Sequence, residues 1–159
     1  MDSDNRYAPP KALVEDATSG SDAGPAPALW NPNAAASWSL LFSPVFGTWL
    51  HMRNWQALGE PQRADAARNW FIAAVVLIAI SMLVAVGAHS SLDGLLRLAT
   101  FAFLIAWYYA AAKPQAAYVR QRFGTAYPRK GWGLPILAAI GAIVAAIVVM
   151  TVLVILGVV

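Results

Sequence analysis

Long apolar runs alternate with short polar segments through residues 70–159, and three of these runs are as long as a membrane-spanning helix. The last run, residues 134–159, has no charged residue, and Thr151 is its only polar side chain. As a helix it is roughly 39 Å long, which exceeds the hydrocarbon core of a bilayer, about 30 Å thick. The pattern therefore predicts transmembrane helices at about 70–88, 94–112 and 134–158.

Residues 35–55 show the spacing of an amphipathic helix, because bulky apolar residues recur at every third or fourth position. Opposite them is a small residue at every fourth position: Ala35, Ser39, Ser43 and Gly47. Such a stripe lets two membrane helices approach closely, so we predict that these four residues form a helix-packing surface. The apolar part is short and contains Pro44. It therefore favours an interfacial amphipathic helix or a re-entrant helix, with a short true span as the alternative.

Residues 1–29 are rich in Pro, Gly, Ala, Ser and acidic residues and have no apolar periodicity. This composition is typical of a disordered tail, because it offers too little apolar surface to fold on. The stretch also lacks the basic start and apolar centre of a signal peptide. We expect a tail over 1–29, with a docking motif near residues 7–10 as the alternative, and a membrane domain over 30–159.

The composition agrees with this class of protein. The 159 residues are 59% hydrophobic and 12% charged, which is too apolar for a soluble domain of this size. There is no cysteine, which excludes disulfides and thiolate chemistry. The expected fold class is all-α integral membrane, with three transmembrane helices plus an N-terminal amphipathic or re-entrant helix.

The basic residues are distributed asymmetrically around the predicted spans. Segment 51–69 holds three arginines, segment 88–93 holds no Lys or Arg, and segment 113–131 holds Lys113, Arg120, Arg122, Arg129 and Lys130. By the positive-inside rule, loops 51–69 and 113–131 are cytoplasmic in a multi-pass protein of the bacterial inner membrane. Met1 is then cytoplasmic if residues 37–51 do not cross the bilayer, and outside if they do. The five basic residues of 113–131 either bind anionic lipid headgroups or act only as a topology signal.

The sequence contains no catalytic, cofactor-binding or metal-binding pattern, so we expect neither an enzyme nor a cofactor, and no nucleic-acid partner. His51 is expected to be an interfacial polar residue, on the opposite side of the membrane from His89. Glu60 and Asp65 each have an arginine three residues later, and Asp93 has Arg97 four residues later, so three local ion pairs are predicted. No Asp, Glu, Lys or His lies in the middle of a predicted span, which counts against an ion-coupled transporter.

Two blocks of sequence carry a resemblance. Residues 38–47 read WSLLFSPVFG and residues 118–127 read YVRQRFGTAY. Together they resemble a type of small, uncharacterised proteobacterial inner-membrane protein with a W-S-L-x-F-x-P-x-F-G block before the first span and a Y-V-x-x-x-F-G-x-x-Y block before the last. The matching positions are Trp38, Ser39, Leu40, Phe42, Pro44, Phe46, Gly47, Tyr118, Val119, Phe123, Gly124 and Tyr127. The leader NRYAPPKA is similar to the N-P-Y-x-P-P opening of such proteins, with Arg6 in place of the first proline. The resemblance implies an inner-membrane location and carries no activity.

These observations favour a non-enzymatic scaffold or interaction subunit that lies in the lipid bilayer and packs against copies of itself or a membrane-protein partner. The last span offers a second close-packing face of small residues: Ala138, Gly141, Ala142 and Ala145. The alternatives are a small oligomeric transporter or channel, and an immunity or envelope-stress protein.

Overall fold

The computed structural model describes residues 25–86 and 90–157, and the ordered elements within these ranges are helices. Most of the predicted tail and His89 lie outside the described residues. Three stretches are long and apolar enough to cross a membrane: Pro61–Ala85, Leu92–Phe123 and Gly133–Ile155. The prediction of three helices of spanning length is therefore confirmed.

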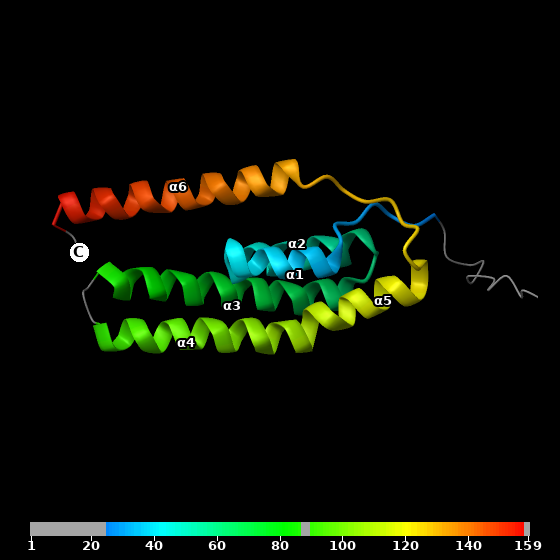
Figure 1. Ribbon diagram of the computed structural model, residues 1–159, viewed down its shortest axis with the longest axis horizontal. Coiled ribbons are helices and arrows are strands. Elements are labelled where there is room, and N and C mark those ends of the chain that lie inside the picture. Colours follow the sequence, from blue (N-terminus) through cyan, green and yellow to red (C-terminus); the bar gives the residue numbers. More distant parts are fainter. Residues whose placement is uncertain (1–24, 87–89, 158–159) are drawn as a thin grey trace, which may run out of the picture.

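Helices α3 (Pro61–Val86) and α4 (Ser90–Trp107) run antiparallel and in contact (Figure 1). α4 continues through a short π-helix, η1 (Tyr108–Ala112), into α5 (Lys113–Phe123). The wide turn has a physical cause in Pro114, which cannot donate a backbone hydrogen bond and whose ring crowds the preceding turn of an α-helix. The second long helix therefore extends well beyond the predicted end at residue 112.

Residues 32–57 form a helical hairpin, made of α1 (Pro32–Leu41) and α2 (Pro44–Ala57), where one helix over 35–55 was expected. That expectation is wrong at Ser43, whose backbone is extended, with φ 173° and ψ 164°. A proline disfavours the helical conformation of the residue before it and is favoured in the first turn of a helix, so Pro44 ends one helix and starts the next. The side chain of Asn31 caps α1 by accepting hydrogen bonds from the backbone N–H groups of residues 33 and 34.

The hairpin lies beside the first half of α3, and its two outer ends lie near the N-terminal end of that helix (Figure 1). One apolar cluster is centred on Ala35, Phe46 and Leu50 of the hairpin. A second joins Trp55 of α2 to Ala64 and Ala67 of α3, with Tyr118 of α5 packed against it. The packed interior of the chain is therefore at this end of the molecule.

Helix α6 (Gly133–Ile155) contributes little to that interior. Figure 1 shows it separated from α4, with the hairpin beside its first turns. The connection before α6 is held by an isolated bridge in which Leu29 N–H donates to Pro128 O over 3.0 Å and Lys130 N–H donates to Leu29 O over 2.9 Å. No residue in the most apolar window of α6 is buried by the rest of the chain.

Candidate functional site

Three fully buried polar side chains follow one another along α2, namely Thr48, His51 and Asn54, and the buried Gln115 of α5 contacts the middle one, His51. The three on α2 are spaced three residues apart, which places them near one another on a helix surface. Each of the four is at most 1% exposed. Because buried polar groups are costly unless they are paired, this cluster must be held by specific hydrogen bonds.

Asn54 pairs with the backbone of Trp30 in both directions. Its Nδ2 donates to Trp30 O over 2.8 Å, and its Oδ1 accepts from Trp30 N–H over 3.1 Å. The indole Nε1–H of Trp30 donates to Gly131 O over 3.0 Å. Asn54 therefore fixes the segment that enters the hairpin, and this segment in turn holds the connection to α6.

His51 lies 3.1 Å through Nε2 from Pro32 O at the start of α1. A carbonyl oxygen can only accept, so Nε2 carries the proton and Nδ1 of the neutral ring is an acceptor. Gln115 Nε2 donates to His51 O over 2.8 Å. Among the described residues, His51 Nδ1 and Gln115 Oε1 have no hydrogen-bond partner, so the cluster retains two buried acceptors.

Trp107, the last residue of α4, closes the cluster from the other side. It is 1% exposed, and its ring meets His51 edge-on at a centroid distance of 5.1 Å. Gly47 of α2 makes this approach possible, because a Cβ there would lie 1.7 Å from Ser39 Oγ and 2.7 Å from the Trp107 ring. The hairpin and α4 therefore meet at a point where only glycine fits.

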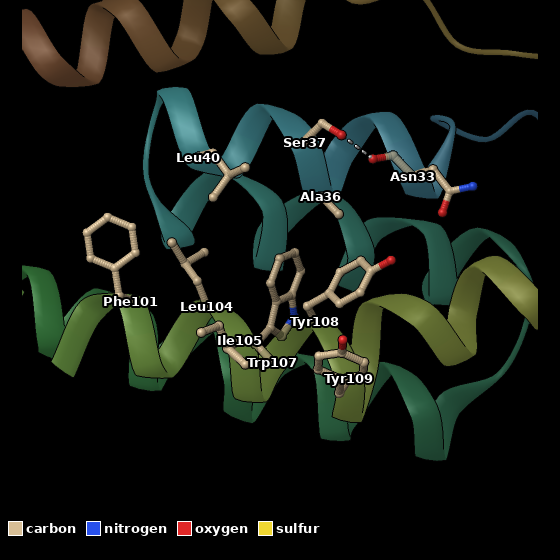
Figure 2. A pocket seen from close by; sticks show the side chains of 10 residues that line it. All are labelled: Asn33, Ala36, Ser37, Leu40, Phe101, Leu104, Ile105, Trp107, Tyr108 and Tyr109. Carbon is tan, nitrogen blue, oxygen red and sulfur yellow. Dashed lines mark hydrogen bonds between the residues drawn. The ribbon is translucent and has the colours of Figure 1, made fainter. Parts of the chain in front are cut away.

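A groove of about 480 Å³ opens between α1 and the α4–η1 junction, with Trp107 in its wall (Figure 2). Asn33, Ser37 and Tyr108 give one end of the groove polar groups. Leu40 and Phe101 line the other end (Figure 2). The groove thus has one polar end and one apolar end. Trp107 lies between the groove and His51.

The residues of the predicted small-residue stripe lie inside the chain. Ala35, Ser39 and Gly47 are buried, and Ser43 is half-buried at the turn of the hairpin. Because the helix breaks at Ser43, Ser39 and Gly47 face each other from α1 and α2. The close approach expected for such residues occurs here between two helices of one chain, so this surface is not free for a partner.

The five basic residues of the predicted headgroup cluster are spread over α5 and the following loop, and several contact the chain itself. Arg122 pairs with Glu60 over 3.5 Å and donates to the Tyr118 hydroxyl. Lys130 Nζ lies 4.4 Å above the ring of Trp30, and Lys113 Nζ lies 5.4 Å from that of Tyr109. Arg120 is exposed on α5, and Arg129 is exposed in the loop, beside Tyr127.

The expected local ion pairs have different outcomes. Asp93 and Arg97 pair over 2.9 Å, as predicted. Glu60 pairs with Arg122 of α5 instead of Arg63, and within the described ranges no salt bridge joins Asp65 to Arg68. The spacing rule considers only one helix, whereas Glu60 lies where α5 crosses the start of α3.

Sequence reasoning predicted an interfacial polar residue at His51 but not its burial within the chain, and it missed Asn54, Gln115 and Trp107. One signal was present: Thr48, His51 and Asn54 repeat at helical spacing. A second was the proline in a long apolar helix directly before Gln115. Neither signal reveals that the polar residues of α2 contact Gln115 of α5.

No family model, curated protein or solved structure matches this chain.

Burial makes the folding of the hairpin sensitive to pH. It lowers the pKa of His51 from 6.5 to about 4, and the contact with Pro32 O offsets only part of this shift. In the unfolded chain the His51 ring becomes protonated near pH 6.5, whereas in the folded chain it becomes protonated only near pH 4. Stability is therefore complete above the unfolded pKa and declines as the pH falls from 6.5 towards 4.

We expect the thermal unfolding midpoint in detergent to be constant above about pH 7 and to decrease steadily between pH 6.5 and 4. The variant His51→Gln retains an N–H donor towards Pro32 but does not titrate, so its midpoint should change less over this range. Equal pH profiles for the two proteins would show that other groups cause the acid sensitivity.

Proposed function

We propose that this protein is a non-enzymatic scaffold or interaction subunit of the bacterial inner membrane, and that α6 is its partner-binding helix. The observation that carries the proposal is the exposure of α6. Its most apolar 18-residue window has a mean hydropathy of 2.9, and none of that window is buried within the chain. A helix that packs so little on its own chain is available to a second copy or to another membrane protein.

The position of the charges supports a cytoplasmic placement for the packed end of the molecule. Both ends of the hairpin lie beside the start of α3, near the arginines of 51–69 and the basic segment 113–131. The hairpin is then re-entrant in the cytoplasmic leaflet and contributes no crossing of the bilayer. This orientation places Met1 on the cytoplasmic side and the end of α6 outside.

The small residues of α6 support a close helix–helix contact. Ala138, Gly141, Ala142 and Ala145 are all exposed, and a Cβ at Gly141 would meet no atom within 4 Å. Membrane helices associate through such faces, because small side chains allow the backbones to approach. Transport is less well supported, since neither 70–85 nor 134–157 contains a charged residue.

Cysteine cross-linking tests the proposal, because the native chain has no cysteine. In membranes treated with a mild oxidant or a short bifunctional thiol reagent, Ala145→Cys should give a discrete adduct with a second copy or another membrane protein. Ile147→Cys is the matched control, since residue 147 is exposed on the same helix and points in a different direction. Equal yields at the two positions, or no adduct at residue 145, would contradict the assignment of this face.

A further inference from the structure

Arg63, near the start of α3, is a cation without a carboxylate partner. Its guanidinium lies 4.4 Å from the ring centroid of Tyr118 and 5.0 Å from that of Trp55. Neither of the two salt bridges in the described part of the chain involves it. Stacking on the faces of two rings fixes the guanidinium and leaves its in-plane N–H groups able to donate to an anion.

Glu60, the acidic residue three positions before Arg63, already has partners. Glu60 accepts from the Tyr118 hydroxyl and pairs with Arg122 over 3.5 Å. The three charged side chains around Tyr118 therefore comprise two cations, Arg63 and Arg122, and one anion, Glu60. One positive charge remains uncompensated, and it belongs to Arg63.

Arg63 borders a groove of about 470 Å³ between α3 and the η1–α5 segment. Gln121 supplies a second polar side chain to this groove. The rest of the lining is largely apolar, with a run of small side chains: Ala66, Ala67, Ala110, Ala111 and Ala117. Trp70 also lines it, next to the apolar part of α3. The groove therefore combines one cationic side chain with an apolar floor of alanines.

Arg63 lies at the aqueous edge of the lipid headgroup layer. Trp70 begins the apolar run of α3, and Arg63 precedes it by seven residues, or roughly 10 Å along a helix axis. The headgroup layer adds about 5–7 Å to each side of the hydrocarbon core. With Trp70 at the edge of the hydrocarbon core, the backbone of Arg63 lies roughly 3–5 Å outside the headgroup layer, next to the lipid phosphates.

We propose that this groove binds one anionic phospholipid. Its phosphodiester accepts hydrogen bonds from Arg63 and Gln121, and one acyl chain lies along the alanine floor. The inference rests on the cytoplasmic placement proposed above but does not depend on α6 having a partner. It assigns the lipid to Arg63 rather than to the five basic residues of 113–131.

Native mass spectrometry of the full chain, released from detergent with added lipid, tests the site. The wild type should retain one phosphatidylglycerol in preference to phosphatidylcholine of the same chain length. Arg63→Gln should weaken phosphatidylglycerol binding about tenfold, because it removes both a surface charge and charge-assisted hydrogen bonds. Arg68→Gln removes the same charge from an exposed position on the same helix outside the groove, and should change binding less than about twofold.

Two further variants separate the headgroup from the chain. Arg63→Lys keeps the charge but loses the planar fork, so its affinity should lie between those of wild type and Arg63→Gln. Ala66→Leu fills the groove floor and should weaken binding of long-chain phosphatidylglycerol while leaving Arg63 in place. Circular dichroism of each variant should show the helix content of the wild type, so that a loss of lipid reports the groove and not the loss of the fold.

Three results would overturn the proposal. Equal losses for Arg63→Gln and Arg68→Gln would indicate a diffuse charge effect. Equal retention of phosphatidylcholine and phosphatidylglycerol would remove the requirement for an anion. Competition by inorganic phosphate as effective as that by phosphatidylglycerol would make this a simple anion site. Any of these leaves the cross-linking result at Ala145 unaffected, so failure here is distinct from failure of the proposed function.

Discussion

Gly47→Ala is expected to destabilise the hairpin by about 1–3 kcal/mol, and Gly47→Leu by more. The added Cβ would lie 1.7 Å from Ser39 Oγ, 3.0 Å from Ser39 Cβ and 2.7 Å from the ring of Trp107. Ser39 Oγ is held by its hydrogen bond to Ala35 O, and Trp107 is enclosed. The free energy of unfolding, measured by titration with a denaturing detergent and followed by tryptophan fluorescence, reports the change.

A matched control is Gly94→Ala in α4, where a Cβ would meet nothing within 4 Å. This substitution should be neutral or slightly stabilising, since alanine is the better helix former. The double variant Ser39→Ala/Gly47→Ala should cost less than the sum of the two single variants, because removing Oγ relieves one of the clashes. Simple additivity would show that residues 39 and 47 do not meet.

Asn54→Ala is expected to cost about 2–3 kcal/mol, because it leaves the N–H and C=O of Trp30 without their partners. The effect should spread to the connection before α6. Leu29 is bonded to Pro128 and Lys130, and the Trp30 indole is bonded to Gly131. If the connection before α6 is loosened in this way, limited digestion with trypsin should cleave faster after Arg129 and Lys130 than in the wild type.

The exposed residue Asn69 provides the control, since Asn69→Ala removes the same amide from a surface position on α3. Its digestion pattern should match that of the wild type. Unchanged cleavage in Asn54→Ala would mean that the connection before α6 is held by contacts other than those of Leu29 and Trp30.

The three long helices were predictable because the thickness of a lipid bilayer requires a minimum length of apolar sequence. A helix that crosses a bilayer needs an apolar run of fixed minimum length, and such runs are visible without knowledge of the fold. The pairing of Asp93 with Arg97 was predictable for a similar reason, because both residues lie within one helix. Features that depend on a single element are therefore accessible from the sequence.

The hairpin and its polar cluster were not predictable in the same way. Pro44 marked a break, but a proline does not say whether the chain bends slightly or turns back. Asn54 bonds to Trp30, 24 residues earlier, and Gln115 bonds to His51 across 64 positions. Contacts of this range are determined by how helices pack, and no local spacing encodes them.

The π-helical turn η1 determines which side of α5 faces the rest of the chain. Each residue advances an α-helix by about 100°, so losing one alanine from residues 110–112 would rotate α5 by more than a quarter turn. Gln115, which donates to His51 O of α2, would then face away from α2, and the buried Val119 would leave its present neighbours. The chain should accordingly accept exchanges of side chain in this stretch more readily than changes in its length.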